Sequence, residues 1–262
     1  MASAVRPLLL LSNDDGIGAS GLQALREALA SFADVVVVAP EHDQSATGHA
    51  LTLRRPLRLR ELDEGQHALD GTPADCVYLA LHLEGFLPRT PDLVVAGLNH
   101  GPNLGSDVFY SGTVAAAREG ALRGVPAVAF SLVGQPDGLA AAAERAARIV
   151  RALLTLDEAA RPRLLNVNFP PGRPEGARAT RLGRRHYADG VTVRTDPRGR
   201  AYFWIGGPGE AHHPPMDDAD TTAIDQGWIS ITPLSLLATD ERHLASAGAL
   251  AEASTPPRQE PT

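Results

Sequence analysis

The sequence predicts an α/β fold, with a mostly parallel sheet between two layers of helices in a Rossmann-like three-layer core. Short apolar runs alternate with segments of helical periodicity over most of the chain before residue 170. The first run, 8–11, is followed by Ser12, Asn13 and Asp14, and the run 93–96 ends in Gly97, as buried parallel strands do where they meet loops. Alternation of this kind is typical of βαβ units, whose helices cover both faces of one sheet.

The elements before residue 100 follow this alternation closely. A strand is predicted at about 7–12, and a helix follows at 20–31, where Leu22, Leu25 and Leu29 recur at helical spacing. The other elements predicted in this part are a strand at 34–40, a polar extended stretch at 51–62, a helix starting near 72–73 and a strand at 92–96.

The later part of the chain continues the alternation and then departs from it. The elements predicted here are helices at 113–123 and 139–154, strands at 125–130 and 164–169, hairpin strands at 191–194 and 201–206, a short helix at 221–226 and a strand at 228–233. We expect one domain over 1–242, with a core at about 7–175, a C-terminal β-hairpin extension at about 176–240 and a disordered tail at 243–262.

A lone hairpin is marginally stable, so we expect the extension to be covered by another subunit through an exchanged arm.

Composition excludes several classes of protein. All 24 basic residues are arginine, so a Walker-type phosphate loop, a Schiff base and a lysine general base are excluded. The net charge of −7 argues against a nucleic-acid binding surface, and no apolar run has the ~20 residues that cross a bilayer. Cys76 is the only cysteine, which fits a reducing cytoplasm, and its apolar surroundings indicate a packing residue.

Two adjacent carboxylates follow the first predicted strand. Asp14, Asp15 and Gly16 follow the apolar run 8–11 after Ser12 and Asn13. In open α/β sheets, ligands bind beyond the carboxyl ends of the strands. Neighbouring carboxylates at such a place repel each other unless a cation lies between them. The pair therefore indicates half of a site for a hard metal ion.

A second polar block, residues 97–113, follows the predicted strand at 92–96 and is expected at the same edge of the sheet. It ends in Ser111, Gly112 and Thr113, directly before a helix that has no acidic residue until Glu119. Free amides and the helix dipole make such a terminus an anion site. The alternative is plain capping of the helix by Ser111 or Thr113.

The segment Gly16-Ile17-Gly18-Ala19-Ser20-Gly21 also matches the dinucleotide fingerprint, and Glu41 follows about 20 residues later, as a ribose-binding acid would. An NAD-linked oxidoreductase is therefore an alternative. Against it, Asp14 and Asp15 stand where a pyrophosphate would approach. Two further alternatives are a simple turn at Asp15 and Gly16, and a module that binds nucleotide without catalysis.

Several separated segments resemble the SurE family of survival-protein nucleotidases, in order, from about Pro7 to Asp240. The segments that carry the resemblance are 12–16, 44–46, 97–103, 110–120, 196–200, 204–207 and 227–234. The resemblance implies a metal-dependent phosphatase, a 5′-nucleotidase that acts on nucleoside 5′- and 3′-monophosphates, with polyphosphate a further substrate in some members. It also implies a homodimer or homotetramer joined through the hairpin region.

The resemblance places the metal ligands on Asp14, Asp15, Ser45 and Asn99. All four offer oxygen, which suits one Mg²⁺ or Mn²⁺ per subunit rather than zinc. The residues expected to bind substrate phosphate are Asn13, Asn99, Asn103, Ser111, Gly112 and Thr113.

Asp14 or Asp15 is the catalytic residue expected to take the proton of the attacking water, with direct attack by an aspartate as a second route.

The histidines allow two interpretations each. His100, in the second polar block, either contacts the phosphate as a proton donor or is a solvated loop residue. His212 and His213 resemble a metal-binding pair, but the sequence offers no evident third ligand, which favours a surface loop.

Overall fold

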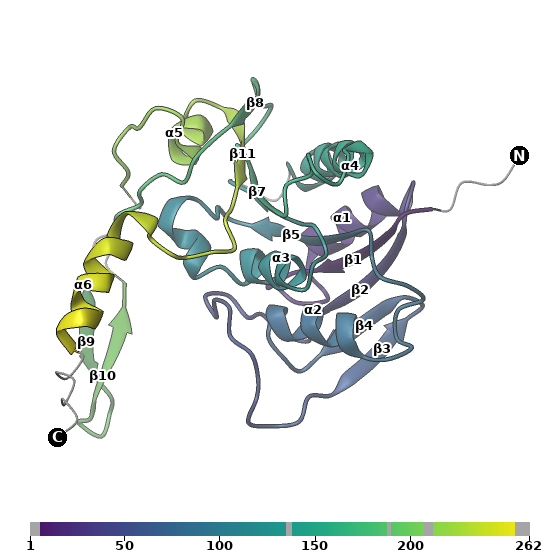
Figure 1. Cartoon of the computed structure of the whole chain (residues 1–262). Coiled ribbons are helices and arrows are strands. Elements are labelled where there is room, and N and C mark those ends of the chain that lie inside the picture. Colours follow the sequence, from purple (N-terminus) through teal and green to yellow (C-terminus); the bar gives the residue numbers. More distant parts are fainter. Residues whose placement is uncertain (1–5, 135–137, 188–189, 207–211, 255–262) are drawn as a thin grey trace, which may run out of the picture.

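A nine-stranded sheet forms the centre of the protein, shown in Figure 1 as a computed structural model. The structure describes residues 6–134, 138–187, 190–206 and 212–254. The strand order is β3-β4-β2-β1-β5-β6-β7-β11-β8. The strands are β1 Leu8–Ser12, β2 Asp34–Pro40, β3 Leu59–Asp63, β4 Gln66–Leu69, β5 Leu93–His100, β6 Ala127–Leu132, β7 Leu164–Phe169, β8 Gly176–Ala179 and β11 Trp228–Pro233.

The middle of the sheet is parallel, as predicted. β4, β2, β1, β5, β6 and β7 all run in the same direction, whereas β3 is antiparallel to β4 and β11 is antiparallel to β7. The carboxyl ends of the parallel strands therefore meet at one edge, where the two polar blocks of the sequence begin.

Helices cover both faces of the sheet (Figure 1). The helices are α1 Ser20–Ala30, α2 Pro73–His82, α3 Gly112–Leu122, α4 Leu139–Thr155, α5 Asp220–Asp225 and α6 Leu244–Ser254, with 3-10 turns η1 Gly105–Phe109 and η3 Glu241–His243. Because successive side chains of a strand point to opposite faces, Leu9 and Leu11 pack with α1 and α4, and Leu10 packs with α2 and α3.

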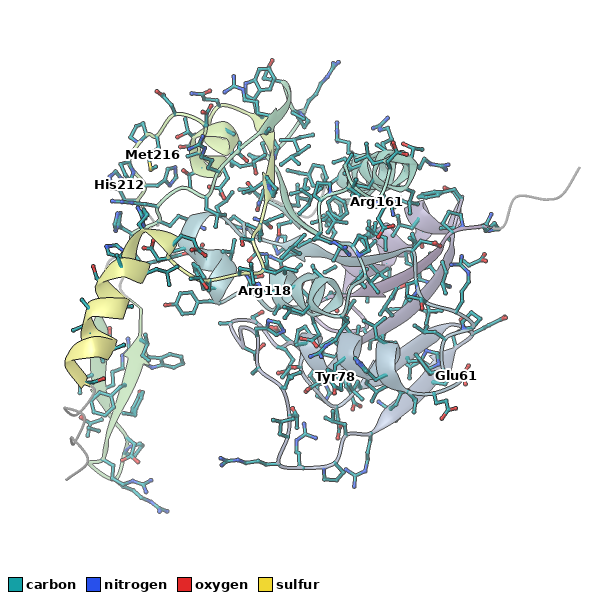
Figure 2. All side chains as sticks on the ribbon, in the orientation of Figure 1. Glu61, Tyr78, Arg118, Arg161, His212 and Met216 are labelled. Carbon is teal, nitrogen blue, oxygen red and sulfur yellow. The ribbon has the colours of Figure 1, made fainter. Side chains whose placement is uncertain are left out.

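The face that carries α2 and α3 also holds Cys76, which is fully buried in an apolar cluster, as expected of a packing residue. Figure 2 shows Tyr78 on α2 and Arg118 on α3. No helix among the described residues has the length and apolar character needed to span a bilayer.

The expected boundary of the core near residue 175 differs from the observed sheet. β8 and β11, which lie within the predicted extension, are strands of the main sheet. β11 pairs with β7, which would otherwise be an edge strand with unpaired backbone groups, and β8 pairs with β11.

The hairpin itself forms as predicted, from β9 Val191–Thr195 and β10 Ala201–Ile205. It makes a separate two-stranded sheet that projects from the rest of the chain (Figure 1). Every residue of both strands is exposed, including Phe203 and Trp204.

The segment expected to be a disordered tail contains a helix. α6 occupies Leu244–Ser254, where the alanine-rich composition favours helix formation. The remainder of that predicted tail, 255–262, lies outside the described residues.

Candidate active site

The acidic pair lies beside the end of β5. Ser12 of β1 is in register with Ala96 of β5, so the residues that follow β1 lie next to the last residues of the β5 strand. The amide of His100 approaches Asp15 Oδ2 at 3.5 Å, across 85 positions of sequence. The two polar blocks therefore meet at one edge of the sheet, as the strand pattern predicted.

Asp14 is 5% exposed and packs against the first turn of α3. The Thr113 hydroxyl donates a hydrogen bond to Asp14 Oδ1. Asp14 packs so closely on Gly112 that a Cβ atom at that position would lie only 2.7 Å from the Asp14 Cβ. Burial, and to a smaller extent the Asp15 charge, raise the pKa of Asp14 to about 6 against the lowering effect of the Thr113 hydrogen bonds.

Asp15 is half-buried, and its surroundings also favour the neutral acid. Burial raises the pKa of Asp15, the hydrogen bond from the His100 amide lowers it, and the nearby Asp43 carboxylate raises it. Both carboxylates of the pair are thus poorly solvated as anions, and a cation beside them would restore the charged form.

The loop that carries Ser45 closes over Asp14. The Gln44 amide donates to the Asp14 carbonyl oxygen at 2.8 Å, and the Ser45 hydroxyl donates to Asp43 Oδ1 at 2.6 Å. Further along the same loop, the Gly48 amide donates to the Tyr110 carbonyl at 3.0 Å. The loop therefore connects the acidic pair to the start of α3.

Asn99 is directed by an irregularity at the end of β5. The register with β6 shifts between Ala96 and Asn99, and Gly97 in between has φ +123°. A Cβ atom on Gly97 would lie 2.4 Å from the Phe130 carbonyl oxygen, so only glycine fits this bulge. The Asn99 amide nitrogen donates to the Gly101 carbonyl at 2.9 Å, which leaves Oδ1 as the oxygen available to a cation.

These residues suit a hard divalent ion by the chemistry of their donor atoms. Asp14, Asp15, Ser45 and Asn99 all offer oxygen, and the burial of the two carboxylates favours a compensating positive charge. Within the described ranges, no group of three or more His, Cys, Asp or Glu side chains could hold a metal ion. A site here would thus depend on the serine and asparagine oxygens as well as the carboxylates.

Two asparagines expected to contact phosphate instead form hydrogen bonds inside the protein. Asn103 Nδ2 donates to the Ser131 hydroxyl at 2.8 Å, and its backbone amide donates to Asn168 Oδ1 at 2.9 Å. Asn13 Nδ2 donates to the Gly16 carbonyl at 2.9 Å, while its buried Oδ1 has no hydrogen-bond partner among the described residues. Both side chains shape the loops of the site in this structure.

The start of α3 shows the capping that the sequence offered as an alternative to an anion site. Ser111 Oγ accepts a hydrogen bond from the Val114 amide at 3.0 Å. Thr113, expected to bind phosphate, donates to Asp14 instead. Sequence reasoning missed this contact, since it joins residues 99 positions apart. The serine retains a hydroxyl proton, so capping and anion binding are compatible here.

The glycines of the dinucleotide-like motif have structural explanations. A Cβ atom on Gly21 would lie 2.1 Å from the Leu98 carbonyl oxygen, so this glycine lets α1 pack closely on β5. Glu41, the expected ribose-binding acid, forms an ion pair with Arg60. Both observations argue against the dinucleotide interpretation.

In the part of the chain that the structure describes, the histidines belong to no metal cluster. His100 is exposed, and its Nε2 lies 3.1 Å from the Gly134 carbonyl oxygen. His213 pairs with Asp225 at 2.6 Å, and His212 forms an isolated backbone bridge with His186. These contacts favour the surface-loop interpretation of His212 and His213.

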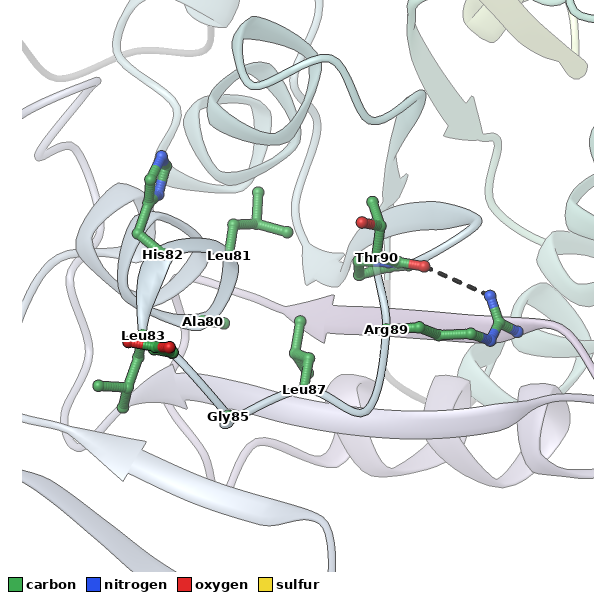
Figure 3. A pocket seen from close by; sticks show the side chains of 10 residues that line it. Ala80, Leu81, His82, Leu83, Gly85, Leu87, Arg89 and Thr90 are labelled. Carbon is green, nitrogen blue, oxygen red and sulfur yellow. Dashed lines mark hydrogen bonds between the residues drawn. The ribbon is translucent and has the colours of Figure 1, made fainter.

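A separate hollow of about 260 Å³ lies at the C-terminal end of α2, lined by Leu81, Leu87 and Thr90 among others (Figure 3). The Arg89 side chain in its wall donates to the Arg6 carbonyl at 3.0 Å, just before β1 begins. This hollow therefore lies near the amino ends of the strands, away from the acidic pair.

The structure is an α/β protein with a Rossmann-like sheet, and its adjacent carboxylates Asp14 and Asp15 lie at the carboxyl edge of that sheet beside the N-terminus of α3. The chain belongs to the SurE family, because the family model described as "Survival protein SurE" matches residues 9–189. This confirms the resemblance seen in the sequence motifs.

Relatives and a solved structure extend the similarity to nearly the whole chain. A protein named 5′-nucleotidase SurE from Sorangium cellulosum is 54% identical, covering 94% of this chain and 96% of its own length. Another of that name from Desulforudis audaxviator is 49% identical, covering 88% and 93%. The crystal structure of the SurE protein from Aquifex aeolicus has 40% identity and a TM-score of 0.81, over 94% of this chain and 100% of that one.

Proposed function

We propose that this SurE-family protein is a 5′-nucleotidase, a phosphatase that converts nucleoside 5′- and 3′-monophosphates to nucleoside and inorganic phosphate. The observation that carries the proposal is the Asp14–Asp15 pair, in which Asp14 is buried against the first turn of α3 and Asp15 is half-buried beside the end of β5. The relatives named 5′-nucleotidase SurE, about half identical over most of the chain, support it. Short polyphosphate is a further candidate substrate.

The activity would depend on one Mg²⁺ or Mn²⁺ per subunit, held by Asp14, Asp15, Ser45 and Asn99. The free Oδ1 of Asn99 and the poorly solvated carboxylates support this ligand set. When bound, a divalent ion of this kind neutralises phosphate oxygens and lowers the pKa of bound water.

The chain itself would hold the phosphate at the start of α3. The Gly112 amide, the Ser111 hydroxyl and the positive end of the helix dipole lie together at the start of α3, which contacts Asp14. Thr113 would keep Asp14 in place through its hydroxyl. Asp14 or Asp15 would take the proton of the attacking water, and direct attack by one of these carboxylates is the second route.

Asn103 would act on the reaction through the loop rather than on the phosphate. Its side chain and backbone hold the segment after Asn99 against β6 and β7. This contact would fix the position of the loop that carries Asn99.

The chain would work as a homodimer or homotetramer. The hairpin of β9 and β10 exposes Val191, Phe203, Trp204 and Ile205, and an isolated two-stranded hairpin with an apolar surface needs a partner. A second subunit is the partner we propose, through exchange of this hairpin.

A panel of nucleoside monophosphates, assayed for phosphate release with and without a chelator, tests the function. We expect release from AMP and related substrates in Mg²⁺ or Mn²⁺, and loss of release in the chelator. Binding of AMP without phosphate release in the presence of metal would instead indicate a non-catalytic nucleotide-binding module.

A further inference from the structure

Two adjacent aromatic side chains stand exposed beside the proposed phosphate site. Phe109 ends the η1 turn and Tyr110 follows it, and each is 68% exposed. They directly precede Ser111, which caps α3. Single exposed apolar side chains are common, but two successive exposed rings directly before the start of α3 offer π-faces to which a flat apolar group can bind.

The backbone beneath these rings is held on several sides. The Tyr110 amide donates to the Asp107 carbonyl at 2.9 Å, and the Tyr110 carbonyl accepts from the Gly48 amide at 3.0 Å. Arg118 of α3 donates to the Val108 carbonyl at 3.4 Å. The two exposed rings are therefore carried by a fixed backbone segment, which lowers the entropy cost of binding to them.

Phe109 also borders a hollow of about 290 Å³ between η1 and the segment 182–186. The buried Asp220 carboxylate accepts the Gly105 amide at 2.9 Å and the Gly183 amide at 2.7 Å, which joins the two walls. Arg184 and His186 line the same hollow and offer polar groups at its rim.

The spacing along the chain fits a nucleotide. Gly112 contacts Asp14, since a Cβ atom there would lie 2.7 Å from the Asp14 Cβ, and Tyr110 is two residues before it. Two residues span at most about 7 Å of chain. In a nucleoside 5′-monophosphate one sugar separates the base from the phosphate. With phosphate at the start of α3, the base reaches Phe109 and Tyr110.

We propose that Phe109 and Tyr110 form the surface on which the nucleobase of the substrate stacks. The inference rests on the proposed nucleotidase function and names the part of the site that selects nucleotides over other phosphate esters. Base–aromatic stacking tolerates all bases, because every base presents a π-face. The site therefore accepts both purine and pyrimidine monophosphates and discriminates against esters that lack a base.

The test compares AMP with glycerol 2-phosphate, an ester without a base, as substrates of the full chain with Mn²⁺. In Phe109→Ala and Tyr110→Ala, the KM for AMP rises by about 5- to 100-fold with little change in kcat, the loss expected when stacking on one base is removed. The kcat/KM for glycerol 2-phosphate stays at the wild-type value. Phe109→Tyr and Tyr110→Phe, which keep a ring, retain the wild-type KM for AMP.

An unchanged KM for AMP in both alanine variants overturns the stacking surface. An equal loss of kcat/KM on both substrates also overturns it, since that result indicates general damage to the site. Failure of the wild-type protein to hydrolyse either ester in Mn²⁺ overturns the proposed function itself, and the stacking surface with it.

Discussion

The contact between Gly112 and Asp14 allows a sharp test of the site, through the substitution Gly112→Ala. The new Cβ atom would lie 2.7 Å from Asp14 Cβ and 3.0 Å from Pro73 Cγ, whereas ordinary contacts begin at 3.4 Å. Asp14 or the first turn of α3 must therefore move by about 0.7 Å, the difference between these two distances. Alanine also favours the helix, by up to ~1 kcal/mol over glycine, so the fold is not expected to be lost.

We expect kcat/KM for AMP to fall by about 10- to 100-fold in Gly112→Ala, because a displacement of about 1 Å in a catalytic group can cost ~100-fold in rate. The free energy of unfolding should change by less than about 2 kcal/mol, as helix preference partly offsets overpacking. Phosphate release and urea denaturation measure the two quantities.

Gly18→Ala is the matched control, since a Cβ atom there meets nothing within 4 Å, and it should retain full activity. A folded Gly112→Ala protein with wild-type kcat/KM would refute the placement of Asp14 in the reaction.

Three further predictions concern stability and assembly. Asp220→Ala leaves three buried backbone amides without an acceptor, so urea denaturation should show a loss of about 3 kcal/mol, and a loss below about 1 kcal/mol would contradict this. Burial raises the pKa of Glu119, but hydrogen bonds from His49 and Arg123 outweigh it, so its pKa lies below the ordinary 4.5. The resulting contribution to the free energy of unfolding is present above about pH 4.5 and is lost as pH falls through the lowered pKa of Glu119. In Glu119→Gln, the free energy of unfolding measured by denaturation should therefore fall less steeply at acid pH, and an unchanged acid dependence would contradict this role of Glu119. Deleting residues 189–207 should convert the assembly to monomers or aggregates by light scattering, and a wild-type monomer at micromolar concentration would refute the exchanged hairpin.

The central strands and helices of the fold could be predicted, because their hydrophobic pattern marks them in the sequence. β1 and β7 fall where strands were predicted at 7–12 and 164–169, and the parallel order brought the two polar blocks to one edge. β8 is four residues long, Gly-Ala-Arg-Ala, and carries no strand pattern, so only its pairing with β11 reveals it.

The site was predictable to the level of its segments but less so to the level of its side chains. Asp14 and the start of α3 were expected together, yet the side-chain directions of Thr113 and Asn103 depend on contacts across 99 and 28 residues of chain. The same limit applies to Asp220, whose carboxylate joins loops far apart in sequence. Such contacts have no local pattern, because irregular loops fix side-chain direction through their tertiary surroundings.

The most direct test of the account is calorimetric titration of the metal-free protein with Mn²⁺, followed by AMP hydrolysis at each metal concentration. The account predicts one ion per chain, phosphate release that rises with metal occupancy, and loss of both in a folded Asp14→Asn protein. Full hydrolysis in the absence of bound metal, or wild-type metal binding and turnover in Asp14→Asn, would contradict it.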